Sequence, residues 1–163
     1  MRRQVVQADE KFTVPTPVGD ISVYIRNEKV VQVDYASRTR ATSKKLSPCA
    51  ARIKKQIQSY FQSAAHKFDL PLETDGTDFQ KRVWRLLRTI PTGKTLTYGE
   101  IAKRLHTSPR AVGNACRTNP VPLIVPCHRV VAKEGIGGFG GKTEGANISR
   151  KRWLLNHEGA ISA

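Results

Sequence analysis

Three helix-start signals lie close together in the second half of the chain, and they constrain its fold more than any other feature. Thr77–Gln80 and Thr97–Glu100 have the spacing of a capping box, in which the first and fourth side chains bond backbone N–H groups that a first turn leaves free. Ser108-Pro109 is a third start, with serine at the cap and proline at the first helical position. The expected helices cover residues 78–90, 99–105 and 110–118.

The second and third of these helices are short and are joined by a turn at His106-Thr107. In a basic protein this arrangement predicts a helix-turn-helix. The third helix carries small side chains, such as Ala111 and Gly113, where a reader of the major groove usually carries long polar ones. Small residues permit a close backbone approach, which favours sequence-independent binding in the narrow minor groove. The alternative is a small-residue helix that packs only against its neighbours.

The first half of the chain has the pattern of an α/β domain. β-Branched and aromatic runs at 12–14, 21–25 and 30–35 predict an antiparallel meander. Ser47-Pro48 predicts the start of a helix, and its apolar stripe begins at Cys49. We therefore interpret Cys49 as a core residue.

A boundary between two domains is expected at residues 65–76. This segment has no sustained helical pattern and contains Pro71 and Gly76. The sequence therefore predicts two domains, 1–76 and 77–163. The first is α/β, with an antiparallel sheet and a helix, and the second is mainly α.

The composition favours a nucleic-acid partner. The formal net charge is +15 over 163 residues, more than solubility needs, so a polyanion is the natural partner. The alternative is a merely basic, solvated surface. No apolar run approaches 18 residues and the N-terminus has no secretory segment, so we expect a cytoplasmic protein that does not bind membranes.

The three cysteines, Cys49, Cys116 and Cys127, are widely spaced and odd in number, which argues against a disulfide framework. No C-x₂-C pair and no H-x₃₋₅-H spacing is present, so no metal site is expected.

Cys127 and His128 form the strongest chemical signal. A thiolate is a far better nucleophile than a thiol, and a neighbouring imidazole can serve as its base. The alternative is a buried, inert cysteine. The loop at 135–141 contains a literal G-x-G-x-x-G, but too few residues follow it for a dinucleotide-binding unit, and we expect no cofactor. Glycines beside a nucleophile instead allow the backbone to approach a flat ligand.

With these motifs in hand, the chain resembles the O6-alkylguanine-DNA alkyltransferases, also called methylated-DNA–protein-cysteine methyltransferases. The resemblance is close over 77–163 and looser before it. It rests on the following segments: Phe79-Gln80, Val83-Trp84, Ile90-Pro91, Thr97-Tyr98-Gly99, Arg110-Ala111-Val112-Gly113, Asn119-Pro120, Pro126-Cys127-His128-Arg129-Val130 and Trp153-Leu154-Leu155 with His157-Glu158-Gly159.

The resemblance implies a ribonuclease-H-like first domain and a second domain whose helix-turn-helix binds the minor groove. It implies a monomer that binds double-stranded DNA carrying O6-alkylguanine and flips the damaged nucleotide. It implies that the alkyl group passes irreversibly to Cys127, so that each molecule acts once. Whether O4-alkylthymine is also repaired, and which alkyl groups are preferred, the sequence leaves open.

The resemblance also assigns roles by position. Cys127 resembles the acceptor, His128 the base acting through a water, Glu158 the acid that orients the histidine, and Asn119 the brace between the DNA helix and the site. Substrate contacts are implied for Tyr98, Arg110, Val130, Phe139 and Gly140. Contacts to DNA are implied for Gln80, Gly99, Ala111 and Lys133. Phe139 stands where relatives often have tyrosine, so it keeps the ring but lacks the hydroxyl.

Three other functions remain open: a lesion binder that transfers nothing, a helix-turn-helix regulator, and a cysteine hydrolase. Cys127 argues against the first. A regulator would be supported by an added sensory domain. A hydrolase would turn over a thioester or a peptide repeatedly.

Overall fold

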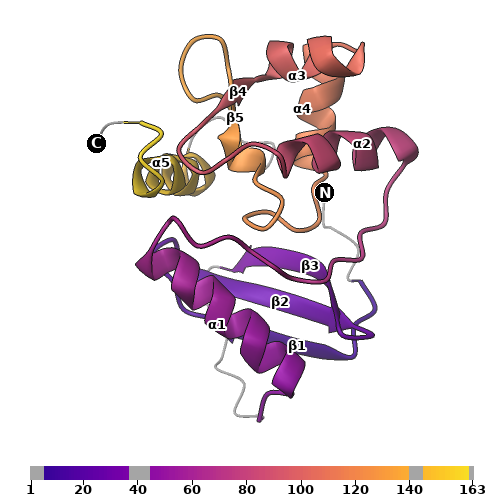
Figure 1. Ribbon diagram of the computed structural model, residues 1–163, viewed down its shortest axis with the longest axis vertical. Helices are drawn as coiled ribbons and strands as arrows, with labels where there is room; N and C mark the ends of the chain where they lie inside the picture. The colour runs from indigo at the N-terminus through magenta and orange to yellow at the C-terminus, as the bar shows by residue number, and fades with distance from the viewer. Residues whose placement is uncertain (1–5, 37–44, 140–144, 162–163) are drawn as a thin grey trace. The chain divides into compact units, whose positions relative to one another are not determined.

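The computed structural model describes residues 6–36, 45–139 and 145–161, and it divides into two compact units, Met1–Asp75 and Gly76–Ala163 (Figure 1). Each unit has its own sheet and helices, so each is described by itself. Treating them as the independent domains 1–76 and 77–163 stays a prediction.

The first unit is a three-stranded antiparallel sheet with one helix. Strands β1 (Glu10–Val14), β2 (Asp20–Arg26) and β3 (Lys29–Ala36) lie in the order β1-β2-β3, which confirms the predicted meander. Asn27 and Glu28 join β2 to β3 with φ angles of 51° and 62°. Two successive positive φ angles are typical of the tight turn whose twist matches a hairpin.

Helix α1 (Pro48–Gln62) begins at the predicted cap, where the Ser47 hydroxyl accepts a hydrogen bond from the Ala50 N–H at 3.1 Å. It buries a stripe of four residues: Ala50, Ile53, Ile57 and Tyr60. The prediction that Cys49 belongs to this core is wrong. Cys49 is half-buried at the first turn and its thiol donates to the Glu28 carbonyl at 3.4 Å, because the buried stripe starts one residue later.

The second unit is mainly helical and follows the three helix-start signals. It contains α2 (Asp78–Leu87), β4 (Leu96–Thr97), α3 (Tyr98–Leu105), α4 (Pro109–Arg117), the short 3₁₀ helix η1 (Cys127–Arg129), β5 (Val130–Val131) and α5 (Ala146–His157). Both capping boxes are formed, at Thr77 and at Thr97. Helices α3 and α4 each begin one residue before the expected position.

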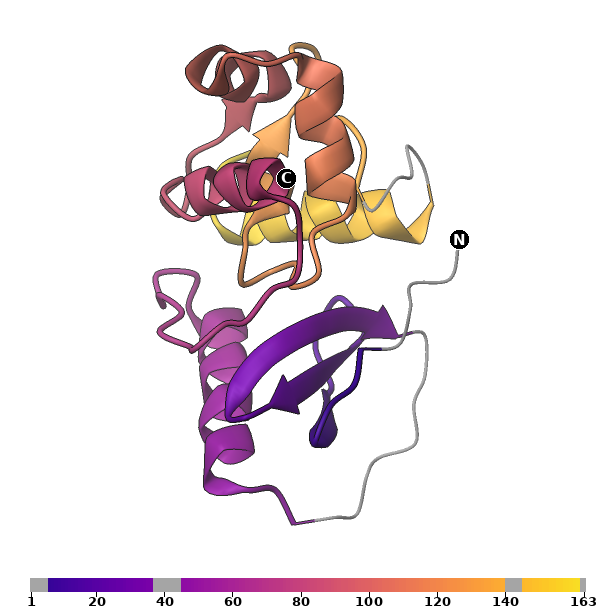
Figure 2. The same cartoon turned by 90° about the vertical axis from the view of Figure 1, so that its right-hand side faces the viewer.

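Two contacts tie the helices of this unit to the segment that holds Cys127. The Trp84 indole N–H of α2 donates to the Ala115 carbonyl of α4 at 2.8 Å, in the buried interior. Strands β4 and β5 pair in parallel, with Leu96 opposite Val130 (Figure 2). The start of α3 therefore lies beside the residues that directly follow η1.

The two units together make a mixed α/β protein. Within residues 6–36, 45–139 and 145–161, no helix has both the length and the apolar character needed to span a membrane.

Candidate active site

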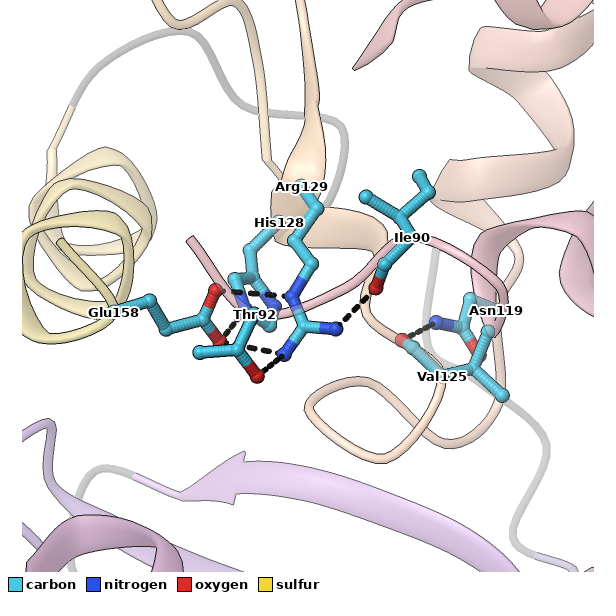
Figure 3. A network of polar contacts seen from close by, with 7 residues as sticks. All are labelled: Ile90, Thr92, Asn119, Val125, His128, Arg129 and Glu158. Carbon is cyan, nitrogen blue, oxygen red and sulfur yellow. Dashed lines mark hydrogen bonds and ion pairs between the residues drawn. The ribbon is translucent and has the colours of Figure 1, made fainter. Parts of the chain in front are cut away.

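The chain between α4 and η1 is held by one buried amide. Asn119, 1% exposed, donates from Nδ2 to the Val125 carbonyl at 2.9 Å (Figure 3). Its Oδ1 accepts from the Val121 N–H at 3.0 Å. A buried polar side chain that satisfies two backbone groups fixes the path of both. Asn119 therefore fixes the loop that delivers Cys127.

Cys127 opens η1 and is buried, with 7% of its surface exposed. Its N–H donates to the Val125 carbonyl at 2.8 Å, so Cys127 and Asn119 share one acceptor. His128 follows in the same turn and is fully buried.

A short hydrogen bond links His128 to the end of α5. Its Nε2 lies 2.7 Å from Oε1 of Glu158, and both side chains are completely shielded from solvent (Figure 3). Because a carboxylate only accepts, the imidazole proton belongs on Nε2, which leaves Nδ1 as the basic nitrogen. Nδ1 is buried and makes no hydrogen bond within the described part of the chain.

Arg129 binds the same carboxylate from the other side. Its Nε donates to Oε2 of Glu158 at 2.9 Å, and one terminal nitrogen donates to Oε1 at 3.0 Å. The remaining donors bond the Ile90 carbonyl at 2.6 Å and the Thr92 hydroxyl at 3.2 Å. One carboxylate thus serves a histidine and an arginine together (Figure 3).

The charges of this network follow from burial and pairing. Burial lowers the pKa of His128, and Arg129 lowers it further, against the opposing effect of Glu158. Burial alone would raise the pKa of Glu158, but the hydrogen bonds and charges of His128 and Arg129 hold it well below its usual range. At neutral pH the site therefore contains a neutral imidazole beside an ionised carboxylate.

Lys151 of α5 is a second buried cation near the thiol. It is fully buried, and its Nζ donates to the Val130 carbonyl at 2.6 Å and to the Gly138 carbonyl at 2.8 Å. Burial lowers the pKa of Lys151 to about 8, an effect that an ionised Cys127 would oppose. The ammonium therefore ties the segment after η1 to the glycine loop and stabilises a thiolate nearby.

Tyr98 completes the surroundings of the thiol. Its hydroxyl lies 3.5 Å from the Gly138 carbonyl, and the Lys151 ammonium lies 5.9 Å above its ring. Burial raises the pKa of Tyr98, so the phenol keeps its proton at neutral pH. A Cβ on Gly137 would lie 3.2 Å from the Tyr98 ring, so this glycine permits close packing of the loop.

None of the three cysteines, all of which lie within the described residues, forms a disulfide. Among the residues that the structure describes, no group of three or more histidine, cysteine or acidic side chains is arranged to hold a metal ion.

Comparisons with known proteins agree on one family. The family described as "6-O-methylguanine DNA methyltransferase, DNA binding domain" matches residues 78–160. A methylated-DNA–protein-cysteine methyltransferase of Metallosphaera sedula is 35% identical over 150 residues, which is 91% of this chain and 92% of that protein. One of Mycobacterium tuberculosis H37Rv is 39% identical over 156 residues, 90% of each. The chain belongs to the methylated-DNA–protein-cysteine methyltransferase family.

Solved structures agree. The crystal structure of the M. tuberculosis O6-methylguanine methyltransferase superposes with a TM-score of 0.77 at 35% identity, covering 94% of both chains. A crystal structure of the M. tuberculosis protein in complex with DNA gives a TM-score of 0.75 at 35% identity, covering 91% of this chain and 92% of that one.

The structure brings one group of the predicted site residues close together. Cys127, His128 and Glu158 form the centre, with Asn119 connected to it through Val125. Val130 and Tyr98 are joined to the same place through Lys151 and Gly138. Phe139 is buried, with 6% exposed, and Gly140 lies outside the described residues.

The other predicted contacts lie on α2, α3, α4 and the loop after β5. Arg110, Gly99 and Lys133 are exposed, and Ala111 is half-buried in the first turn of α4. The side chain of Gln80 is engaged within the protein, since its Oε1 accepts from the Thr77 N–H and its Nε2 donates to Thr118 at 3.0 Å.

Sequence reasoning missed Lys151 and Arg129. A lysine in a helix is usually solvated, so a fully buried one leaves no mark in composition or periodicity. Arg129 stands within the quoted motif, and its position next to His128 was the one available signal.

Proposed function

We propose that this protein repairs DNA by removing the alkyl group from O6 of O6-alkylguanine and holding it on the Cys127 sulfur. One observation carries the proposal: Cys127 opens a turn whose next residue, His128, is buried and bonded to Glu158 at 2.7 Å. A cysteine, a histidine and a carboxylate in this order are the parts of an activated thiol. The chain is thus a methylated-DNA–protein-cysteine S-methyltransferase, as its relatives are named.

The chemistry is a displacement at carbon. The thiol proton passes through a water to Nδ1 of His128, and the resulting thiolate attacks the alkyl carbon. The S–C bond forms as the C–O6 bond breaks, and the electron pair of that bond leaves with the base. The base then gains a proton, with Tyr98 assisting its delivery. The thioether is stable, so the protein is consumed in a single turnover.

Positioning accounts for much of the rate. Displacement requires the sulfur to lie in line with the C–O6 bond, and well-oriented groups react with effective molarities of about 10⁵ M or more. Asn119 and Lys151 hold the backbone on both sides of Cys127 through carbonyls of Val125 and Val130. Val130, Phe139 and Gly140 are the proposed lining of the guanine pocket.

The target base is inaccessible in a duplex, so the nucleotide must be flipped out. Flipping costs a few kcal/mol, which Arg110 offsets by entering the stack that the guanine leaves. Helices α3 and α4, with an αL residue at His106 ending α3, are the proposed helix-turn-helix on the minor groove. Gly99, Ala111, Gln80 and Lys133 are the proposed contacts to the DNA.

The proposal extends to the molecule as a whole. The first domain, 1–76, is proposed to be ribonuclease-H-like, and the second, 77–163, to hold both chemistry and DNA binding. The protein is proposed to act as a cytoplasmic monomer on double-stranded DNA without a cofactor.

Mass spectrometry tests the transfer. Incubation with duplex DNA carrying O6-methylguanine is expected to add one methyl group per molecule, on Cys127, and no more with excess DNA. Cys127→Ala should acquire none and leave the DNA methylated. Cys49→Ala, which removes a thiol from the other compact unit, is the matched control and should behave as the wild type. Methyl loss from DNA with Cys127→Ala, or repeated turnover, would exclude the proposal.

A further inference from the structure

Arg129 has no role in the mechanism above, yet its guanidinium bonds Glu158, Ile90 and Thr92 together. Its guanidinium makes two hydrogen bonds to Glu158, at 2.9 and 3.0 Å, in a side-on pairing. Its side chain is 12% exposed and that of Glu158 is fully shielded. A bidentate pair of this kind has a defined orientation as well as attraction, because the guanidinium is a rigid planar fork.

The position of Arg129 does not depend on Glu158 alone. Its other donors bond the Ile90 carbonyl at 2.6 Å and the Thr92 hydroxyl at 3.2 Å, in the turn that follows α2 (Figure 3). Gly93 of the same turn packs on the end of α5, where an added Cβ would lie 3.2 Å from the Glu158 carbonyl oxygen. The arginine is thus anchored to a separate segment and holds the carboxylate from outside α5.

The shared oxygen decides what Arg129 does to His128. Oε1 of Glu158 lies 2.7 Å from Nε2 of His128 and 3.0 Å from a terminal nitrogen of Arg129. A buried carboxylate with only a histidine beside it favours a protonated imidazole, because the ion pair satisfies both charges. An imidazolium has no free lone pair and cannot take the thiol proton. The fixed positive charge of Arg129 beside the same carboxylate opposes protonation of His128.

We propose that Arg129 is a positioning residue of the proposed alkyl-transfer site: it fixes the Glu158 carboxylate and adds to burial in keeping His128 neutral, so that the imidazole can act as a base. The proposal rests on the proposed function for the reaction, but its claim about His128 holds for the free protein. The charged groups that act on His128 are Glu158 and Lys151 from α5 and Arg129 from η1. Lys151 is retained in every variant below, so differences between them come from Arg129.

Titration of His128 in the free protein is the direct test. Ring NMR signals of His128 are followed against pH in the wild type, Arg129→Gln and Arg129→Lys. Loss of the charge in Arg129→Gln should raise the midpoint by about one pH unit. Arg129→Lys keeps the charge and should titrate close to the wild type. Arg152→Gln removes an exposed arginine from α5 and is the charge-matched control.

The pH dependence of methyl transfer separates this role from a structural one. In Arg129→Gln the acidic limb of the single-turnover rate should move to higher pH by the same amount, with recovery towards the wild-type rate above it. In Arg129→Lys the limb should stay in place while the rate falls at every pH, since one ammonium cannot reproduce the fork. Damage to the fold alone would lower the rate of Arg129→Gln at every pH without moving the limb.

The outcomes distinguish the effect of Arg129 on charge, its effect on positioning and the proposed function. An unmoved His128 midpoint in folded Arg129→Gln overturns the charge claim. A wild-type rate in Arg129→Lys overturns the positioning claim, and this variant decides the matter if Arg129→Gln does not fold. If the wild type takes no methyl group from DNA, the proposed function fails, but the titration of His128 still decides the role of Arg129.

Discussion

Lys151 is the residue whose charge most directly concerns the thiol. Burial lowers its pKa to about 8, so the ammonium is charged at pH 7 and loses its proton as the pH rises through 8. Lys151→Met removes that charge, so the thiolate form of Cys127 should become less favourable. Iodoacetamide alkylation of Cys127 at pH 7 is expected to slow by about tenfold as a result. Arg152→Met, an exposed change on the same helix, should react as the wild type; equal rates for both variants would show that Lys151 does not support the thiolate.

The ionisation of Glu158 should make the stability of the folded protein depend on pH in the acid range. Its pKa in the folded protein lies below the ordinary value of 4.5, so its contribution to stability is present above pH 4.5 and is lost as the pH falls below it. Glu158→Gln leaves Arg129 without its partner and should cost about 3–5 kcal/mol at pH 7. The gap in unfolding free energy between wild type and variant, measured with urea, should narrow as the pH falls below 4.5. The methyl-transfer rate should drop by about 10²-fold or more. A gap that stays constant with pH would contradict this assignment of charge.

At the scale of elements, the sequence predicted the helix caps and turns that depend on residues close together in the chain. The caps at Thr77, Thr97 and Ser108 are formed because their partners lie three residues away, and each helix starts within one residue of its expected position. The meander was predictable for the same reason, since Asn27 and Glu28 form its turn.

The sequence did not reveal pairings between distant segments. Strands β4 and β5 have two residues each and lie 33 positions apart in sequence (130 − 97), too short for any periodicity to show. On α5 the apolar residues Ile148 and Trp153 are only half-buried, while Lys151 is buried with Leu154 and Leu155. A buried charge depends on carbonyls supplied by other segments, which no local pattern contains.

The glycine loop offers a test of close packing between elements. Gly137 has φ +73°, and an added Cβ would lie 3.1 Å from the Ala132 nitrogen and 3.2 Å from the Tyr98 ring. Gly137→Ala should therefore displace the loop or the ring and slow methyl transfer. Gly135→Ala is the matched control, because Gly135 has φ +80° but nothing within 4 Å of an added Cβ. Each change should cost about 1–2 kcal/mol through backbone strain, but only Gly137→Ala should also slow the transfer beyond its loss of stability. Equal rates for both variants, measured in single turnover, would mean that the Tyr98 packing is irrelevant.

At the scale of the whole molecule, the net charge of +15 should make DNA binding, but not the transfer reaction, depend on salt. Binding that releases counterions weakens steeply with salt, by about 10³-fold or more between 50 and 200 mM if six or more phosphates are contacted. The reaction centre is shielded, since His128 and Glu158 are buried, so its chemistry should respond little to salt. Transfer from duplex DNA at subsaturating protein should therefore fall steeply with added salt, whereas transfer from free O6-alkylguanine base should hardly change. Lys133→Gln should reduce the salt slope for undamaged duplex by about one, as expected for one phosphate contact. If transfer from duplex DNA and transfer from the free base depended equally on salt, salt would act on the reaction itself. The positive charge of the protein would then not be needed for DNA binding.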